Sequence, residues 1–487
     1  MPAPESSIAT SVETERAFQA RWRSLGDARH DALFDRLIEN EYRDEQDQSS
    51  RLIQALNRVL LQAMADVPFY REQGYAGLSS SPIAATADLA RFPVLTRYDV
   101  LNNFARLTSR DRQFNSTNTS ITSTSGSTGL PAKVLNTADN LGMFALLWQR
   151  QARWHRLDLS KRFARIRIAG DLFRQPDGAP LREGQTARNP RWLHSGKFFQ
   201  TGDEIHFTNN NPRPTQIEWL QLNSPAYLMT YPGLLEEIVL ANDCAAIPGL
   251  DACIVVSSML TEAMAARIRN ALGIPVHRNY GLNEVGIVAV MCSAGRYHVN
   301  TEHACVEIVD DGGNPVAAGE SGRLLVSTLN NPAMPLVRYD SGDLATASAG
   351  ACPCGRSLPS FENILGRHIR FAGTPPQTRP RLNGLLGVLS GMPNEMFRNI
   401  RRYQIFQNRD ADFEMRLVTT GPVHEEFEPR LQENWRQTNG EDGWRLTIVR
   451  VEELVRTPSG KELDFYSAFQ ESVPEYYNDG SGKQDQS

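Results

Sequence analysis

Strand-like and helix-like segments alternate through the middle of the chain, and this alternation is the feature that most constrains the fold. The runs "FARIRIAG" from Phe163 and "DACIVVSS" from Asp251 are short and apolar, as buried strands are. The stretches "ADNLGMFALLWQRQARWHRL" from Ala138 and "TEAMAARIRNAL" from Thr261 show helical spacing of their apolar residues instead. Strands that alternate with helices favour an α/β sheet, and we therefore predict an α/β fold.

The pattern changes on both sides of this region. Residues 1–65 predict helices, and the pieces between about Tyr297 and Ala347 are β-rich, with "DDGG" between apolar runs as a hairpin signal. After Gly366 a Pro/Gly-rich stretch predicts a linker. We predict a large multi-subdomain α/β domain over residues 1–366, with a β-rich portion. A small, mobile α+β lid would span 367–473, and a disordered tail 474–487.

Composition excludes several classes of protein. The net charge of −5 argues against a nucleic-acid binder, and one dense basic cluster, Arg398 with Arg401 and Arg402, is typical of a solvated helix face. The longest apolar runs are far shorter than the ~20 residues of a membrane span, and the polar N-terminus is unlike a secretory signal. Six cysteines in such a chain indicate reduced thiols or a metal site. We expect a cytoplasmic protein without membrane or nucleic-acid partners.

The loop "TSGSTGLPAK" predicts a phosphate-binding segment. Its glycines permit close approach of the backbone to a ligand, and its hydroxyls can donate to phosphate oxygens. The loop is not a Walker A motif, because no "GK[ST]" ends it. A flexible linker has the same composition, so the loop alone leaves both readings open. The candidate ligand-binding residues are Thr124, Ser125, Gly126, Ser127, Thr128, Gly129 and Lys133.

Four further polar segments follow this loop in a fixed order. They are "RNYGLNEVG" with Glu284, "VRYDSGDLA" with Asp343, "ILGRHIRFAG" with Arg367, and "RTPSGKELDF" with Lys461. Taken singly, each is typical of an exposed charged residue in a turn.

In this order and spacing the segments resemble the adenylate-forming superfamily, which includes acyl-CoA synthetases, peptide-synthetase adenylation domains and luciferase. The chain is most similar to the phenylacetate-CoA ligase branch. Further support comes from "VPFYREQG", "FPVLTR", "TYPGLLEEIV", "YGLNEVG" and "CPCGR". The resemblance covers roughly residues 60–470, and the phosphate loop and "YGLNE" are its most specific parts.

The resemblance implies a role for each residue at the nucleotide. The loop from Thr124 to Lys133 would hold the ATP phosphates, and Glu284 would bind the Mg²⁺ that bridges them. Asn279 and Tyr280 would lie beside the adenine and the α-phosphate. Asp343 would accept hydrogen bonds from the ribose hydroxyls.

The resemblance is less complete in the region of the lid. Arg367 would contact ribose or phosphate at the hinge, and Lys461 on the lid would bridge the attacking carboxylate and the α-phosphate. The sequence departs from the family at Ser257-Ser258-Met259, where a glycine-rich segment is expected, and at Ile369, where the hinge usually has an acid. The adenylation residues are therefore better supported than the lid rotation or a thioester step.

Four residues form a candidate zinc site. Cys292, His298, Cys352 and Cys354 offer three thiolates and one imidazole, which suit tetrahedral structural zinc, and the resembling branch has a similar arrangement. Their spacing is unlike common zinc fingers, and isolated cysteines are often buried hydrophobes, so both interpretations stay open. The remaining cysteines are expected in the core: Cys244, Cys253 and Cys305.

The acid would bind below the nucleotide, between the helix after the phosphate loop and the "YG" strand. The candidate lining residues are Phe144, Trp148, Tyr231 and Gly281, although aromatics at helical spacing are also typical of a core. A flat aromatic acid is the class that the resemblance favours.

We predict an enzyme of the acid–thiol ligase type. It would convert an acid and ATP to acyl-AMP and pyrophosphate, with Mg²⁺, and pass the acyl group to coenzyme A as the first-choice acceptor. The alternatives are transfer to an amine, a carrier protein or another nucleophile in a biosynthetic pathway, or a non-catalytic nucleotide-binding homologue. The presence of both Glu284 and Lys461 argues against the last. A homodimer is compatible with these expectations.

Overall fold

The computed structural model describes most of the 487-residue chain. The described residues are 5–72, 81–123, 132–168, 175, 179–242, 245–260, 262–367, 389, 392–397, 399–409, 412–439, 445–455 and 465–467.

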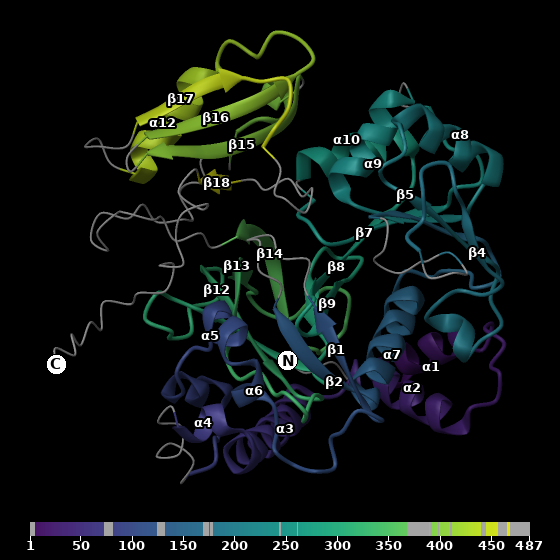
Figure 1. Cartoon of the computed structure of the whole chain (residues 1–487), viewed down its shortest axis with the longest axis vertical. Coiled ribbons are helices and arrows are strands. Elements are labelled where there is room, and N and C mark those ends of the chain that lie inside the picture. The colour runs from purple at the N-terminus through teal and green to yellow at the C-terminus, as the bar shows by residue number, and fades with distance from the viewer. Residues whose placement is uncertain are drawn as a thin grey trace.

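A 12-stranded sheet runs through the N-terminal part, in the order β11-β12-β13-β14-β10-β9-β8-β7-β6-β3-β5-β4 (Figure 1). Its parallel half contains β3 (Phe163–Arg167), β5 (Glu204–Thr208), β6 (Tyr227–Thr230), β7 (Ala252–Val255) and β8 (Val276–Leu282), with β4 (Ala187–Asn189) antiparallel at the edge. Its antiparallel half contains β9 (Gly286–Met291), β10 (Tyr297–Val299), β11 (Ala304–Val309), β12 (Ser321–Thr328), β13 (Tyr339–Ala347) and β14 (Ser360–Arg367). The predicted α/β fold is confirmed.

The parallel strands are apolar on both faces because helices cover both. Alternate residues of a strand point to opposite faces. On β7, Ile254 therefore packs against the layer that contains α7 (Ala138–Trp154) and α2 (Ala28–Asn40), whereas Cys253 and Val255 pack against α8 (Arg213–Asn223), α9 (Pro232–Ala241) and α10 (Glu262–Leu272). Figure 1 shows α8, α9 and α10 grouped together, apart from α7, α1 (Glu5–Gln19) and α2.

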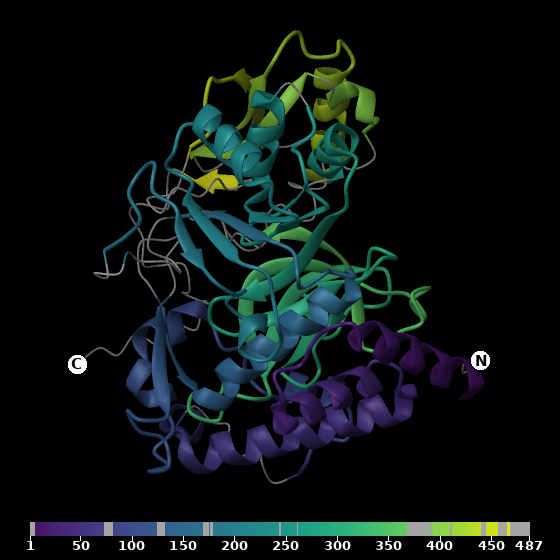
Figure 2. The ribbon, with the colours of Figure 1, turned by 90° about the vertical axis from the view of Figure 1, so that its right-hand side faces the viewer.

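The antiparallel half packs against the long helix α3 (Glu45–Asp66), which Figure 2 shows along one side of the molecule. Leu52, Leu56 and Leu60 recur every fourth residue and form one stripe of its core cluster. The same cluster includes Val288 of β9 and Tyr339 of β13. Short helices follow α3: α4 (Pro68–Glu72), α5 (Arg97–Asn102) and α6 (Phe104–Leu107). A separate hairpin pairs β1 (Thr119–Ser123) with β2 (Lys133–Thr137) on either side of the predicted phosphate loop.

The predicted "DDGG" turn follows β11. Gly313 adopts a positive φ of 82° and donates its N–H to the Asp310 carbonyl at 3.1 Å. The chain then makes one antiparallel bridge, Val309 to Pro315, and the longer partner of β11 is β12.

The C-terminal region has its own four-stranded sheet, in the order β17-β16-β15-β18, and its own core (Figure 1). Its elements are β15 (Ile400–Arg409), β16 (Asp412–Thr419), α12 (Phe427–Asn439), β17 (Arg445–Arg450) and β18 (Phe465–Ser467). The basic residues expected on a helix face lie differently, because Arg401 and Arg402 belong to strand β15. Arg402 forms an ion pair with Glu237 of α9 at 3.1 Å, which joins the two regions.

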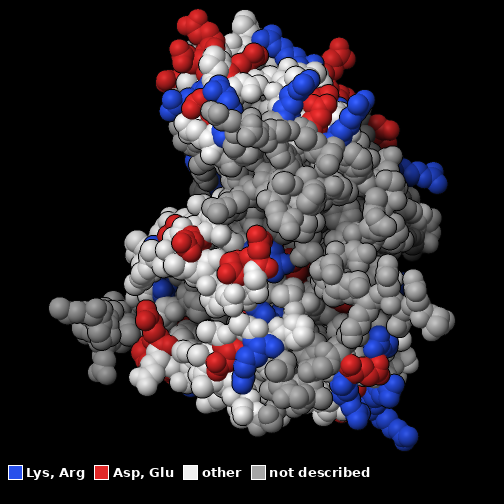
Figure 3. Space-filling view, turned by 90° about the vertical axis from the view of Figure 1, so that its left-hand side faces the viewer, with Lys and Arg blue, Asp and Glu red and all other residues white. Residues whose placement is uncertain are grey.

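Two observations bear on the expected partners. None of the helices in the described ranges is long and apolar enough to span a membrane. On the face drawn in Figure 3, the coloured basic side chains lie interspersed with acidic ones.

Candidate active site

Glu284 lies in the turn between β8 and β9, and two side chains hold it there. The Arg97 guanidinium is 2.7 Å from Glu284 Oε1, and the Tyr339 hydroxyl donates to the same oxygen at 3.1 Å. The Glu284 side chain is only 6% exposed. Burial first, and then the neighbouring Glu284 carboxylate, hold the pKa of Tyr339 well above its usual value, so that its hydroxyl remains a donor.

The "FPVLTR" segment brings Arg97 to this turn. Leu95 forms a parallel bridge with Tyr339, so the segment runs alongside the start of β13. Thr96 then caps helix α5 by a reciprocal pair of hydrogen bonds with Asp99, which fixes Arg97 as the first helical residue. In the sequence this segment indicates only the family resemblance, and Arg97 and Tyr339 were not predicted as partners of Glu284. No pattern local to Glu284 signals them.

Two of the predicted nucleotide-binding residues, Tyr280 and Asp343, are in direct contact. The Tyr280 hydroxyl donates to Asp343 Oδ2 at 2.7 Å. Asp343 lies opposite Arg367 in the β13–β14 ladder, so the backbone places the two predicted ribose-binding residues side by side.

Asn279 lies on the other face of the same strand. Its amide donates to Gln151 Oε1 of α7 at 2.8 Å, whereas its neighbour Tyr280 packs in the core cluster of the antiparallel half. Adjacent strand residues point in opposite directions, so the side chains of Asn279 and Tyr280 lie on opposite faces of β8. A role for Asn279 beside the adenine stays a prediction.

The four predicted acid-binding residues are only partly brought together. Gly281 lies close to Gly286, since a Cβ added to Gly281 would be 2.8 Å from the Gly286 carbonyl oxygen. Gly286 in turn lies close to Phe144, since a Cβ added to Gly286 would be 3.4 Å from Phe144 Cδ2. Phe144 and Trp148 project from α7 into the same layer, where Trp148 is a buried core residue. Tyr231 packs with the opposite layer, and Arg167 covers its ring at 5.1 Å.

Several predicted residues lie outside the described part of the chain. These are the loop residues Thr124, Ser125, Gly126, Ser127, Thr128 and Gly129, together with Lys461, and only the backbone of Arg367 is described. Lys133 is described, as the exposed first residue of β2.

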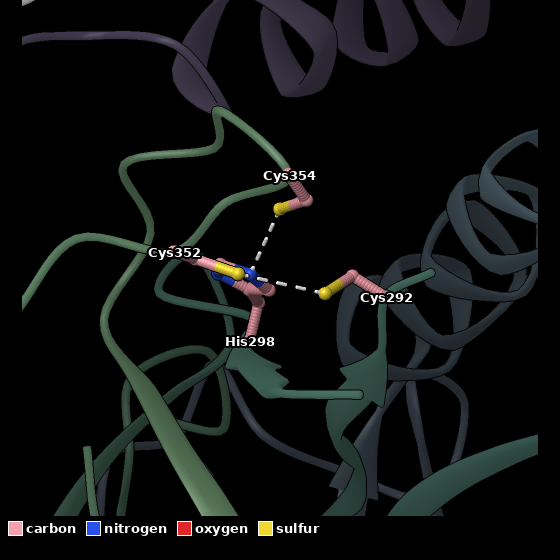
Figure 4. A group of neighbouring side chains, drawn as sticks. All are labelled: Cys292, His298, Cys352 and Cys354. Carbon is pink, nitrogen blue, oxygen red and sulfur yellow. Dashed lines mark hydrogen bonds between the residues drawn. The ribbon is translucent and has the colours of Figure 1, made fainter. Parts of the chain in front are cut away.

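The cysteine and histidine residues of the candidate metal site do converge (Figure 4). The ligand atoms of Cys292, His298, Cys352 and Cys354 all lie within 4.8 Å of one another. Cys292 Sγ is 3.7 Å from Cys352 Sγ, and Cys354 Sγ is 3.2 Å from His298 Nε2. Four ligands at zinc–ligand distances of about 2.0–2.3 Å in a tetrahedron lie roughly 3.3–3.8 Å apart, and the Cys292–Cys352 and Cys354–His298 pairs are already near this spacing.

The surroundings of His298 also suit a metal ligand. Its Nδ1 lies 3.0 Å from the Leu358 carbonyl oxygen, which selects the tautomer with a bare Nε2 facing the thiols. By contrast, Cys253 and Cys305 are buried thiols in apolar surroundings, as expected, and burial raises the pKa of Cys253 to about 12. The third predicted core cysteine, Cys244, is outside the described residues.

Comparison with known proteins gives a consistent picture. Residues 198–331 match the family described as AMP-binding enzyme. The chain is 28% identical over 323 residues to a phenylacetate-coenzyme A ligase of Thermus thermophilus, covering 64% of this chain and 68% of that protein. It is 27% identical over 331 residues to a phenylacetate-coenzyme A ligase of Escherichia coli, covering 64% and 70%.

The fold has counterparts among solved structures. A 2-hydroxyisobutyryl-CoA ligase in the postadenylation state matches with a TM-score of 0.65 and 16% identity, covering 88% of this chain and 91% of that chain. An open conformation of this ligase matches with a TM-score of 0.60 and 17% identity. At such identities the likeness concerns the fold.

Proposed function

We propose that this chain, which is similar to AMP-binding enzymes over residues 198–331 and to two phenylacetate-coenzyme A ligases, is an ATP-dependent ligase that activates a small aromatic acid as its acyl-AMP. The reaction joins the acid carboxylate to the α-phosphorus of ATP and releases pyrophosphate. In a second step an acceptor thiol displaces AMP and forms the acyl product.

The observation that best supports this function is the arrangement around the β8–β9 turn. Tyr280 of β8 donates to Asp343, which lies opposite Arg367 in the β13–β14 ladder. At the end of the β8–β9 hairpin, Arg97 and Tyr339 hold Glu284. The site thus offers a carboxylate suited to a ribose diol and, nearby, a second carboxylate suited to a divalent cation.

Glu284 supplies the anionic oxygen for Mg²⁺ in this proposal. Mg²⁺ would neutralise the charge that develops on the departing pyrophosphate. The cation and the Arg97 guanidinium compete for the same carboxylate, since Arg97 pairs with Glu284 Oε1 at 2.7 Å. Lys461 would join the acid carboxylate and the α-phosphate during adenylation, and the loop 124–133 would hold the phosphates.

Coenzyme A is the proposed acceptor. The similar curated proteins from Thermus thermophilus and Escherichia coli are named phenylacetate-coenzyme A ligases, and an acid that bears an aromatic ring agrees with the Phe144 side of the predicted pocket.

We further propose that Cys292, His298, Cys352 and Cys354 hold one structural Zn²⁺. The donor set, its mutual distances and the orienting Leu358 carbonyl support this assignment. These residues would fasten the turns after β9 and before β14.

Exchange of radiolabelled pyrophosphate into ATP with a panel of acids tests the proposed function directly. We expect exchange that depends on Mg²⁺ and on a specific aromatic acid, followed by AMP and thioester formation when coenzyme A is added. Exchange without thioester would reject coenzyme A and leave adenylation intact. If the protein binds ATP but catalyses no exchange with any acid of the panel, it is the non-catalytic homologue instead.

A further inference from the structure

His194 is a half-buried histidine to which the site described above assigns no role. Its ring packs edge-on against Phe144, with centroids 5.1 Å apart, and tilted against Trp148 at 5.8 Å. Aromatic rings thus flank the imidazole. Within the described part of the chain, neither ring nitrogen of His194 forms a hydrogen bond, although the residue is only partly exposed.

Contacts beside helix α7 lead from His194 to strand β8, and Tyr280, on the opposite face of that strand, belongs to the predicted nucleotide site. Phe144 adjoins Gly286, and the Gly286 carbonyl adjoins Gly281, which follows Tyr280 in strand β8. Tyr280 in turn holds Asp343, the predicted ribose ligand. His194 therefore lies beyond the Gly281–Gly286 contact on the Phe144 side, where the distal end of an acid would lie if its carboxylate met the α-phosphate.

The backbone just before His194 is fixed by hydrogen bonds. The Leu193 N–H donates to Glu204 Oε2 at 2.6 Å, and the Trp192 N–H donates to Thr201 Oγ1 at 2.8 Å. His194 then caps the short 3₁₀ segment Ser195–Lys197. A ring whose backbone is held in this way is preorganised, so that a hydrogen bond from its nitrogens costs little conformational entropy.

Glu204 also neutralises the Arg165 charge next to the His194 imidazole. It pairs with Arg165 at 2.6 Å, and its Oε1 lies 2.9 Å from His206 Nε2. Although burial opposes ionisation, the Arg165 guanidinium lowers the pKa of Glu204 to about 2. The Arg165–Glu204 pair is thus internally neutral, and the Arg165 guanidinium is engaged further by Met229 Sδ at 3.0 Å.

We infer that His194 forms a hydrogen bond with an uncharged polar substituent, a hydroxyl or an amino group, at the distal end of an aromatic acid held beside Phe144. This inference rests on the proposed adenylating function and specifies its substrate class. A polar side chain between two aromatic rings loses water when an unsubstituted ring is bound and gains no partner in return. An acid with a matching donor or acceptor replaces that water.

The charge of the imidazole selects the kind of substituent. Burial first, and then the Arg165 guanidinium, lower the pKa of His194 to about 3, so the ring is neutral at physiological pH and can both donate and accept. A neutral ring offers no counter-charge to a second carboxylate. Dicarboxylic acids are therefore excluded from the class.

The test compares matched acids in the pyrophosphate-exchange assay. Phenylacetate and benzoate are each paired with their meta- and para-hydroxy and amino derivatives and with a dicarboxylic analogue. For the wild-type protein we expect kcat/KM for the best hydroxy or amino acid to exceed that of its parent by about 10-fold, the worth of roughly one net hydrogen bond. The dicarboxylic analogue should fall below the parent.

Three variants assign this preference to the residue. His194→Phe should bring the ratio between substituted and parent acid to about one while exchange with the parent acid persists. His194→Gln, which keeps a donor and an acceptor, should retain most of the preference. His424→Phe, at an exposed histidine ahead of α12, is the matched control and should leave the ratio unchanged.

The outcomes separate the inference from the function on which it rests. A wild-type preference for unsubstituted or dicarboxylic acids, or a preference for hydroxy acids that survives His194→Phe, overturns the role of His194 and leaves adenylation standing. No exchange with any acid overturns the proposed function itself. If His194→Phe fails to fold, as shown by its melting curve, the wild-type panel and His194→Gln still decide.

Discussion

The two ends of strand β9 carry two sites of contrasting chemistry. Ahead of the strand, Glu284 is a single buried carboxylate whose charge is matched by Arg97 from another part of the chain. After the strand, Cys292 joins three other ligand atoms that all lie within 4.8 Å of one another.

The two sites differ in the ligands that they can bind. The Arg97–Glu284 pair lies at a partly accessible turn and can be exchanged for ligand contacts. A cation can then take the place of Arg97 at the carboxylate, and a phosphate can take the place of Glu284 at the guanidinium. A set of three thiols and an imidazole around one centre provides ligands for a soft cation and little else. We therefore expect substitutions at Glu284 to affect catalysis more than stability, and substitutions at the cysteine cluster to do the reverse.

The largest effect should come from the metal cluster. The double variant Cys352→Ser, Cys354→Ser should lose its zinc and more than about 4 kcal/mol of its free energy of unfolding, since metal binding contributes directly to folding. Zinc content by elemental analysis and denaturant unfolding measure the two losses.

The damage should also reach the N-terminal helices. Arg356 follows the cluster and forms ion pairs with Glu15 of α1 and with Glu41, the residue that caps α2, at 3.3 and 3.2 Å. Increased proteolysis near α1 and α2 would follow from a loosened cluster. Cys305→Ala, at a buried thiol outside the cluster, is the control and should keep its zinc. Metal-free wild-type protein of unchanged stability would refute the structural role.

The next effect in size concerns Lys461 and tests whether adenylation at the Glu284 site depends on the predicted C-terminal lid. Lys461→Ala should slow adenylation by about 10²–10³, the usual cost of losing one preorganised charged donor of ~2.7–4 kcal/mol. Thioester formation from synthetic acyl-AMP should be largely unaffected.

Lys161→Ala removes an exposed lysine paired with Asp251 and serves as the control, with no expected change. Equal losses in both half-reactions of Lys461→Ala would indicate a folding defect in the lid. Unchanged rates would show that Lys461 is an ordinary surface lysine.

Much of the fold could be predicted because its signals are local. The strand "FARIRIAG" and the helix from Ala138 have apolar spacing that reports their own burial, and both were found where expected, as β3 and α7. The segment "WLQLNSPAYLMTY" was ambiguous by spacing alone. Ser224, in the left-handed region at φ 43°, ends α8 and separates it from β6.

The site could be predicted only where a motif names its residues. Tyr280 and Asp343 were assigned by resemblance and do meet. Arg97 was missed because its link to Glu284 depends on a bridge between Leu95 and Tyr339, residues far apart in the sequence. The strand position of Arg402 was missed because the apolar residues of "RNIRRYQIF" fit neither a clear helical nor a clear alternating period, whereas the pairing with β16 depends on a later segment of the chain.

A smaller effect is expected at Glu284 itself. Glu284→Gln keeps the shape of the side chain and a hydrogen bond from Tyr339, but it removes the charge that a divalent cation needs. The Mg²⁺ concentration for half-maximal exchange should rise at least about 10-fold, as the loss of a charged contact of ~1.5–3 kcal/mol implies. Titration of exchange with Mg²⁺ measures this shift.

The control for Glu284 is a carboxylate of the same type elsewhere. Glu236→Gln alters a buried glutamate of α9 that pairs with Arg267 at 2.6 Å, and it should leave the Mg²⁺ dependence unchanged. An identical Mg²⁺ titration in wild type and Glu284→Gln would remove Glu284 from the metal site. A large loss of stability in Glu284→Gln would contradict the contrast between the two ends of β9.

The smallest effect should come from Tyr280→Phe, which removes one hydroxyl and leaves the ring in its core cluster. That hydroxyl donates to Asp343 Oδ2, so its loss removes one of the contacts that orient the carboxylate toward a ribose diol. Because the carboxylate itself stays in place and only part of its orientation is lost, we expect a cost of about 1 kcal/mol, near that of one ordinary hydrogen bond, so KM for ATP should rise by roughly 3- to 10-fold with kcat nearly unchanged. Tyr227→Phe removes a comparably buried hydroxyl, which accepts from the Asp158 N–H at 2.8 Å in another layer, and it should leave KM for ATP unchanged. If Tyr280→Phe lowered kcat and left KM unchanged, Tyr280 would act in the transition state and not by positioning Asp343. If both variants behaved alike, the Tyr280–Asp343 contact would be a packing feature, and the nucleotide would depend on the opposite face of β8, where Asn279 lies.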